Sequence, residues 1–271
     1  MLTFVFSGIF VQLLPVVAPA IIRDWALPDT ALALPMAMVL VGAGVGTLLG
    51  GIFSDVIGRR VLIGTSVGAL ALITALSTLA SQPWHLMISM VLGGTAMGCF
   101  FSSGLALVSE IATPQRRALA ISLTVASIPV GLTLASLAGA IVLPAFGWKT
   151  TFLLGALFGV PTLLLFIWFV PESPSFLASK PHRRADYLYV IERLSLPASE
   201  HQGHDEAQPP LARRFLALVR AAPVATVGLL LMFLGANMFG NAVLSWVPVA
   251  FSNLGFPLSF ASGALTGWTT A

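Results

Sequence analysis

The chain has few charged residues and almost no cysteine. Of its 271 residues only 8% are Asp, Glu, Lys or Arg, whereas 57% are hydrophobic. A soluble domain carries about a quarter charged residues. The composition therefore excludes an ordinary soluble enzyme and a nucleic-acid-binding domain, and it indicates a polytopic membrane protein. The single cysteine, Cys99, excludes a disulfide framework and a cysteine-based metal site.

Groups that would do catalysis or hold a metal are also missing. His201 and His204 lie three residues apart in a polar stretch, but no further ligand accompanies them, so a solvated linker explains them better than a metal site. No His cluster, nucleophile motif or pair of carboxylates at membrane depth is present. We expect no metal, no cofactor and no enzymatic activity.

Long apolar runs, separated by charged residues and by Pro or Gly, fill most of the chain. A helix needs about 20 apolar residues to cross a bilayer, and these runs do not alternate as the strands of a membrane barrel do. The predicted spans are 2–22, 31–54, 61–80, 84–108, 118–143, 149–170 and 223–251, with an eighth that starts near Leu258.

The distribution of cations predicts the orientation. If the chain starts in the cytoplasm, eleven of the thirteen Lys and Arg residues fall in inside loops, and only Arg23 and Lys149 fall outside. Cytoplasmic loops carry the excess of cations in membrane proteins. We therefore expect the N-terminus and the central loop to be cytoplasmic. Trp84, Trp148 and His85 then lie at the outer boundary, where aromatic residues often anchor helices in the interface.

The layout predicts three parts. Residues 1–170 form a six-helix transmembrane bundle, 171–222 a cytoplasmic loop, and 223–271 the start of a second bundle, with a seventh helix and part of an eighth. Because apolar residues follow Met1 at once and the chain ends inside an apolar run, we interpret it as a fragment of a longer membrane protein.

Two local patterns add detail to this layout. In the loop, residues 183–194 (RRADYLYVIERL) predict an amphipathic helix on the membrane surface, with Leu188, Ile191 and Leu194 on its apolar face. Within the spans, GAGVG (Gly42 to Gly46) and GTAMG (Gly94 to Gly98) place small residues four apart. That spacing lets helix backbones approach closely, so we expect tight helix packing there.

The segment GIFSDVIGRR (51–60) follows the second span. It resembles the loop 2–3 signature of the major facilitator superfamily, G-x-x-x-D-x-x-G-R-R, at the matching place in the topology. Gly58 permits a tight turn, and Asp55 at a helix end can pair with nearby cations. Such a pair can form in one transporter state and break in another.

Three further segments resemble the aromatic acid:H+ symporter branch of that superfamily. They are SEIATPQRRALA (109–120), FGWKTTFL (146–153) and PESPSFL (171–177), the last shared with sugar porters. The resemblance implies an all-α membrane fold of two six-helix bundles, of which this chain supplies the first and the start of the second. It implies alternating access at a central cavity. The fifth span reads SIPVGLTLASLAGA and lacks the G-P-x-x-G-G element of antiporters, which favours a symporter or a facilitator.

The function implied by the resemblance is secondary transport of a small organic acid across the bacterial inner membrane, with an aromatic acid as the expected substrate and protons as candidate coupling ion. A sugar- or metabolite-type facilitator of the same superfamily and a non-transporting fragment are the alternatives. The expected partners are the substrate and the lipid bilayer, and the family habit is a monomer.

Eight residues are candidates for a conformational switch at the cytoplasmic face. We expect Glu110, Arg116 and Arg117 to form a second charge cluster beside the loop 2–3 signature, with salt bridges that stabilise one state; a purely structural role is the alternative. The eight are Gly51, Asp55, Gly58, Arg59, Arg60, Glu110, Arg116 and Arg117.

The chain departs from the branch pattern at the charged positions. The D-G-x-D element expected in the first helix reads Ser7, Gly8, Ile9, Phe10, and the Arg expected early in the fourth falls near Met90. Charges at membrane depth are costly and usually functional. Our hypothesis is that this half holds neither the proton carrier nor a cation that clamps a carboxylate. Those groups then lie elsewhere in the protein, or it is a facilitator or carries a neutral substrate.

Substrate contacts are expected from polar and aromatic residues of helices 1, 4, 5 and 7, which line the cavity in this fold. Asn237 and Asn241 share one helical face and either line the cavity or bond between helices. Trp246 either stacks on an aromatic substrate or anchors the helix in the interface. The candidates are Gln12, Phe100, Ser103, Thr124, Ser127, Asn237, Asn241 and Trp246.

Overall fold

The computed structural model describes residues 1–113, 115–178, 180 and 183–194, together with separate positions between 220 and 254. Across this part of the chain all regular secondary structure is helical, which confirms the predicted all-α class. The helices are α1 (Leu2–Asp24), α2 (Ala33–Ile57), α3 (Arg59–Leu76), the 3-10 turn η1 (Ser77–Leu79), α4 (Pro83–Ile111), α5 (Arg117–Phe169), α6 (Pro174–Ala178) and α7 (Arg184–Leu194).

Helices α1 to α5 are long and apolar enough to cross a membrane. A helix suits the bilayer because it satisfies its own backbone polar groups. The boundaries of the first four agree with the predicted spans to within a few residues, since apolar runs and turn residues fix them. Pro83 begins α4, where its missing N–H costs nothing.

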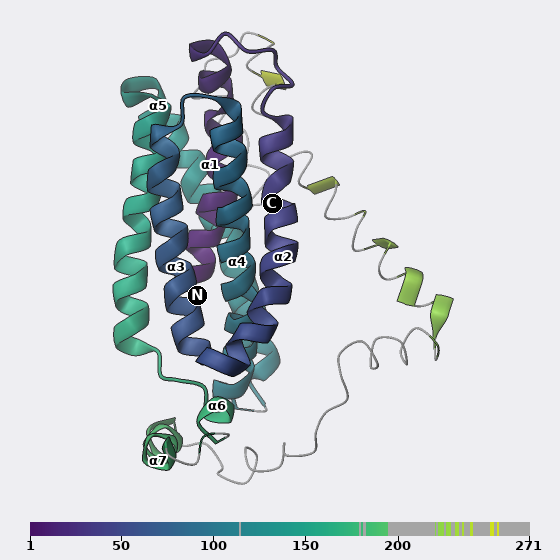
Figure 1. The fold of residues 1–271 in the computed structure, drawn as a ribbon, viewed down its shortest axis with the longest axis vertical. Helices are drawn as coiled ribbons and strands as arrows, with labels where there is room; N and C mark the ends of the chain where they lie inside the picture. The colour runs from purple at the N-terminus through teal and green to yellow at the C-terminus, as the bar shows by residue number, and fades with distance from the viewer. Residues whose placement is uncertain are drawn as a thin grey trace.

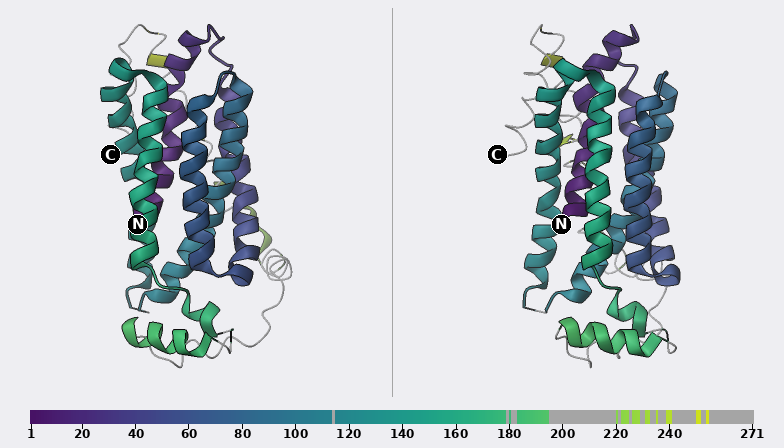
Figure 2. Two further views of the ribbon diagram at one scale, coloured as in Figure 1. Left: turned by 60° about the vertical axis from the view of Figure 1, so that its left-hand side comes forward. Right: turned by 90° about the vertical axis from the view of Figure 1, so that its left-hand side faces the viewer.

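Helix α5 contains two membrane-length arms in one continuous assignment. The sequence predicts two spans, 118–143 and 149–170, with several linking residues. The structure instead changes direction at one residue, Gly147, whose φ of 78° and ψ of 175° are not helical. An unbroken helix of 53 residues would be about 80 Å long, far more than a bilayer holds. Each arm runs along the length of the bundle in Figure 2, so α1 to α5 supply six membrane-length segments.

The long helices form a bundle in which α1 packs along α5, α2 packs along α4, and α3 contacts both α4 and α5 (Figure 1). Of the most apolar window of α1, 94% is buried, against 22% for α2. Helix α1 is therefore enclosed by its neighbours, whereas α2 leaves a broad face uncovered.

Glycine allows the two main pairs of helices to touch. A Cβ atom at Gly46 of α2 would overlap the backbone oxygen of Thr95 on α4, and one at Gly131 of α5 would overlap that of Val5 on α1. Close approach of this kind needs residues without side chains. The prediction of tight packing at GAGVG and GTAMG is confirmed by these contacts.

Helices α6 and α7 lie below one end of the bundle (Figure 1). The predicted helix is present as α7, and its buried face agrees only in part with the predicted one: Ile191 is buried, whereas Leu188 is not. Tyr187, Val190 and Ile191 pack against Leu177 of α6, whereas Leu188 is 54% exposed. The prediction placed Leu188 in the apolar stripe because periodicity alone could not show where α6 lies. Contact of α7 with a membrane stays a prediction.

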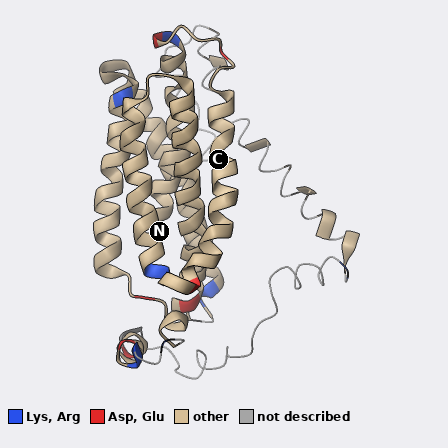
Figure 3. Ribbon diagram, viewed as in Figure 1, with Lys and Arg blue, Asp and Glu red and all other residues tan. Residues whose placement is uncertain are grey.

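Charged side chains gather at the two ends of the bundle, as Figure 3 shows. One end holds the turn between α2 and α3, the last turn of α4 and α6, and is called the α6 end below. The other holds the last turn of α1 and the break at Gly147, and is called the Trp148 end. Between the ends, the sequences of α1 to α5 contain no Asp, Glu, Lys or Arg.

Candidate functional site

The turn between α2 and α3 depends on Gly58. This residue ends α2 and precedes α3, with a φ of 97° that L-residues with side chains rarely adopt. A Cβ atom there would also lie 2.9 Å from Oε2 of Glu172. The predicted tight turn is therefore present, and it brings Arg59 and Arg60 directly into the first turn of α3.

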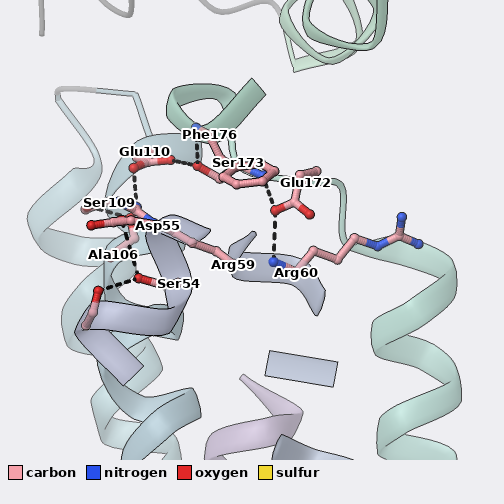
Figure 4. A network of polar contacts seen from close by, with 11 residues as sticks. Ser54, Asp55, Arg59, Arg60, Ala106, Ser109, Glu110, Glu172, Ser173 and Phe176 are labelled. Atoms are coloured by element: carbon pink, nitrogen blue, oxygen red, sulfur yellow. Dashed lines mark hydrogen bonds and ion pairs between the residues drawn. The ribbon is translucent and has the colours of Figure 1, made fainter. Parts of the chain in front are cut away.

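Glu172 caps α3 from a distant part of the chain. Helix α3 has no side-chain cap of its own and no acidic residue in its first turn. Oε1 of Glu172, which is only 7% exposed, accepts the backbone N–H of Arg60 at 2.9 Å and that of Ser173 at 3.0 Å. A carboxylate at a helix N-terminus satisfies free amides and complements the helix dipole, so it fixes the start of α3 (Figure 4).

Glu110 lies at the centre of the contacts between helices at this end. Its Oε1 forms an ion pair with the guanidinium of Arg59, and its Oε2 accepts a hydrogen bond from the Ser173 hydroxyl. The Ser173 oxygen in turn accepts the backbone N–H of Phe176 at 3.2 Å. The side chains of Arg59 and Glu110 are only 18% and 14% exposed, so solvent screens their pair less than a surface pair.

Arg60 joins the same end of the bundle to α5. Its NH2 donates to the carbonyl oxygen of Ile167 at 2.5 Å, in the last turn of α5, where a cation complements the helix dipole. We call Arg59, Arg60, Glu110, Glu172 and Ser173 the α6-end network. It links the turn before α3, the end of α4 and the end of α5, all within residues 59–173.

The other predicted switch residues lie outside this network. Gly51 is exposed, with open space around it. Asp55 is exposed, and its Oδ1 accepts a 3.5 Å hydrogen bond from Ser54; Arg116 and Arg117 are exposed as well. None of these three charged residues forms an ion pair with another residue of the described part. The structure thus brings Glu110 to Arg59 but not to Arg116 or Arg117.

Glu172 and Ser173 are absent from the predicted site residues, although they hold the α6-end network together. Both residues belong to the segment PESPSFL, which indicated a family resemblance but did not predict which residues they contact. A helix start without its own cap, at Arg59, is the signal that could have raised the question of a distant partner. Glu172 lies 112 residues after Arg60 in the sequence, so no local sequence pattern could identify it as the partner.

Trp148 has a contact that the sequence does not predict. We expected an interfacial anchor, but the residue is only 4% exposed. Its Nε1 donates to Oδ2 of Asp24 at 2.9 Å, and its ring meets that of Trp25 edge-on, with centroids 5.6 Å apart. The interface explanation is therefore wrong for Trp148, which joins the last turn of α1 to the second arm of α5.

The substrate candidates on α4 and α5 point into protein contacts. Phe100 is fully buried, with its ring edge-on to that of Phe4 at 5.7 Å between centroids. The hydroxyl of Ser103 donates to the carbonyl of Gly50 at 3.5 Å. Thr124 donates to Ala120 at 2.7 Å, within its own helix. These hydroxyl protons already have acceptors.

Of the remaining five candidates, the structure describes only Ser127 and Gln12. Ser127 donates to the carbonyl of Thr124 at 2.5 Å and to that of Met1 at 3.2 Å. Gln12 on α1 is fully buried, and within the described part of the chain neither its Nε2 nor its Oε1 has a hydrogen-bond partner. The other three candidates, Asn237, Asn241 and Trp246, lie outside the described residues.

A cavity of about 610 Å³ opens near the α6 end. It is lined by the first turn of α1 and by the ends of α3, α4 and α5 nearest to α6, including Phe4, Leu107 and Phe166. Among the described residues that line it, the walls are almost entirely apolar, with Thr3 and Thr162 as polar residues, and none of the described substrate candidates is included. These lining residues contain no Lys, Arg or His side chain that could pair with a carboxylate.

Comparison with known proteins identifies relatives of the whole chain. The sequence model described as "Major Facilitator Superfamily" matches residues 1–271. The gallate transporter of Pseudomonas putida is 28% identical over 189 residues, which is 70% of this chain and 42% of that protein. A 4-hydroxybenzoate transporter of Acinetobacter baylyi is 28% identical over 192 residues, 70% of this chain and 41% of that protein. The chain thus aligns with less than half the length of these curated relatives.

Solved structures support the fold. A crystal structure of a D-xylose-proton symporter superposes with a TM-score of 0.66 at 18% identity, covering 96% of this chain and 63% of that chain. At this identity the likeness concerns the fold alone. The matches confirm the resemblance predicted from the motifs, and the curated relatives are named as transporters rather than enzymes.

Proposed function

The chain belongs to the major facilitator superfamily, and we propose that it is part of a carrier that moves a small aromatic acid across a membrane by alternating access. The observation that carries this proposal is its similarity to transporters of gallate and of 4-hydroxybenzoate. Both compounds are benzoic acids with ring hydroxyls. The segments 109–120, 146–153 and 171–177, which resemble the same branch, support it independently.

The α6-end network supports a first bundle that moves as one body. Every hydrogen bond and ion pair of the network joins residues of the first bundle to one another or to Glu172 and Ser173, which directly follow α5. None of them involves a second bundle, so these contacts can persist when a second bundle rocks against the first. We assign Arg59, Glu110 and Glu172 to holding helices α3, α4 and α5 in register. A carrier needs such rigidity because motion must pass through the interface between bundles.

The exposed charges at the same end are suited to the switch itself. Asp55, Arg116 and Arg117 have no ionic partner among the described residues and are exposed. We propose that they pair with residues of the second bundle in one transporter state and separate from them in the other. Asp55→Asn then lowers the transport rate and leaves the stability of the purified protein unchanged, whereas Glu110→Gln lowers its unfolding temperature.

We propose that the α6 end faces the cytoplasm of a bacterial cell with the protein in the inner membrane. The start of α3 with Arg59 and Arg60 and the start of α5 with Arg116 and Arg117 lie at this end. The last turn of α1 with Arg23 and the break in α5 next to Lys149 lie at the Trp148 end; Figure 3 shows the charged residues at both ends. The excess of cations inside supports this orientation. A cysteine placed at Gln115 is then labelled by an impermeant thiol reagent only in inverted vesicles.

We propose that the membrane-depth part of α1 to α5 holds no carrier for a coupling proton. Between their ends these helices contain no carboxylate, and His85 lies near the start of α4. Proton-coupled transport therefore requires a titrating group from outside these helices. In this proposal the protein is a proton symporter if such a group is present and a facilitator if it is absent.

Uptake competition tests the substrate class. Cells expressing the complete gene product take up labelled 4-hydroxybenzoate, and the expected result is competition by gallate and by benzoate but not by xylose. Competition by sugars and not by aromatic acids would replace the proposal with a sugar- or metabolite-type carrier. Absence of any saturable uptake, with the protein present in the membrane, would favour a non-transporting protein.

A further inference from the structure

Gln12 differs from the other polar candidates of the described helices because its side-chain amide is both enclosed and unpaired. The residue is 0% exposed, and among the described residues neither Nε2 nor Oε1 has a partner. The hydroxyls of Ser103, Thr124 and Ser127 all donate to backbone carbonyls. Gln12 alone of these four candidates keeps its full hydrogen-bonding capacity.

An unpaired amide in this place is costly. Burying an amide without a compensating hydrogen bond is unfavourable, and an apolar residue of similar size would avoid that cost. Gln12 is also the only Asn, Gln, Asp or Glu within Leu2–Ile22. An unpaired buried amide calls for a partner that the described residues do not supply.

The position of Gln12 in α1 shows where that partner enters. Gln12 lies one turn beyond Gly8 on the same face of the helix. Gly8 touches the backbone of α5 at Ile128 and Leu132, so Gln12 lies along the seam between α1 and α5. In the described conformation solvent does not reach the residue, so a partner for its amide meets it in another state of the carrier.

The chemistry of the amide selects among partners. Its oxygen accepts and its NH₂ group donates. A carboxylate only accepts, so it would leave Oε1 unpaired and next to a negative charge. A hydroxyl both donates and accepts, so it satisfies both ends of the amide. No Lys or Arg lies between the ends of α1 to α5 to offset the charge of a carboxylate.

We propose that Gln12 is a specificity-determining residue that binds the ring hydroxyl of a hydroxylated aromatic acid. This inference rests on the proposed function, which supplies an aromatic acid as substrate. Gln12 then orients the molecule with its hydroxyl toward α1, and its carboxylate points away from α1 to α5. The carrier prefers 4-hydroxybenzoate to benzoate for this reason.

The test compares the two acids in wild-type protein and in Gln12→Leu. For each protein, unlabelled 4-hydroxybenzoate and benzoate compete with labelled 4-hydroxybenzoate uptake, and the ratio of their half-inhibiting concentrations measures the preference. In the wild type we expect a preference of about tenfold or more, the value of one good hydrogen bond. In Gln12→Leu the preference falls about tenfold because 4-hydroxybenzoate binds more weakly, while inhibition by benzoate stays unchanged.

A matched control and a second variant guard against misfolding. Thr74→Val removes a buried hydroxyl on α3 that donates to Leu70 at 2.7 Å, and it should leave the ratio unchanged. Gln12→Met keeps the length of the side chain and should act like Gln12→Leu. Since no described partner of Gln12 is lost, neither Gln12 variant should lower the unfolding temperature of the purified protein.

The outcomes separate this inference from the proposed function. A ratio that stays at the wild-type value in both Gln12 variants would overturn the inference and leave aromatic acid transport standing. An equal loss of inhibition by both acids, or a lower unfolding temperature, would make Gln12 structural and also overturn it. Wild-type protein that takes up neither acid would refute the proposed function itself.

Discussion

Replacing Glu172 with alanine is expected to destabilise the bundle, because its carboxylate is the described cap of α3. The change removes the acceptor of two backbone N–H groups, those of Arg60 and Ser173, at 2.9 and 3.0 Å. An orphaned buried donor costs about 1–3 kcal/mol. Because the turn lies at the end of the bundle, we take the lower part of that range for each and expect a total of about 2–4 kcal/mol.

Glu172→Gln separates the role of the oxygen from that of the charge. Glutamine keeps an acceptor for the amide of Arg60 but removes the negative charge from the N-terminus of α3. That charge is worth about 0.3–1 kcal/mol, so the Gln variant should be destabilised much less than the Ala variant. Glu192→Ala, on the exposed face of α7, is the control and should behave as wild type.

The assay is thermal and denaturant unfolding of the complete protein purified in detergent, followed by size-exclusion chromatography of the remaining folded fraction. The order expected for the free energy of unfolding is wild type, then Glu172→Gln, then Glu172→Ala. If Glu172→Ala unfolded like Glu192→Ala, the cap would contribute nothing. If the Gln and Ala variants were equally unstable, the charge rather than the acceptor would dominate, and the reasoning above would be refuted.

Three further predictions concern helix turns and contacts. Gly58→Ala forces a side chain into a φ of 97° and should cost about 1–3 kcal/mol, measured by the same unfolding assay; an unchanged stability would contradict the strained turn. Gly46→Leu places a side chain against the backbone of α4 and should abolish monodisperse folded protein in size-exclusion chromatography, whereas Gly44→Leu, with open space around it, should not. Trp148→Phe removes the hydrogen bond to Asp24 and should cost about 1–2 kcal/mol. In the Asp24→Ala background, which offers no acceptor to Nε1, the same substitution should cost less; an equal cost in both backgrounds would show that the hydrogen bond is not the cause.

The spans and the packing of α2 on α4 could be predicted from the sequence because their causes are local. Apolar runs of bilayer length define the helices, and small residues four apart define a close contact. Gly58 likewise predicts a turn. The division of α5 into two spans was predicted as well, but not that the reversal occurs at a single residue. Pro144 lies within the helix, and the reversal needs only the unusual backbone angles of Gly147.

The contacts of the α6 end depend on residues far apart in the sequence, and for that reason patterns could not supply them. Glu110 has Arg116 and Arg117 nearby along the chain, yet it pairs with Arg59, 51 residues away. Similarly, Tyr187 of α7 is buried because it packs against Leu177 of α6. In each case the contacts of the residue depend on which helix end the fold places beside it.

For Gln12 the sequence predicted the residue but not the reason for its importance. The sequence marks it as the amide of the first span, but its importance comes from the state of its neighbours. Thr124 and Ser127 look equally suitable as ligands until their hydroxyls are found donating to backbone carbonyls. Only the described structure shows that Gln12 has hydrogen bonds still to make.

Counterflow in proteoliposomes tests the central claim most directly, since it needs neither a coupling ion nor a known direction of transport. The complete protein is reconstituted into vesicles loaded with unlabelled 4-hydroxybenzoate, and a trace of labelled compound is added outside. The account predicts that label accumulates transiently above its equilibrium level and that loading with xylose gives no such overshoot. Label that only equilibrates, as in protein-free vesicles, would contradict the assignment of this chain to a carrier of aromatic acids.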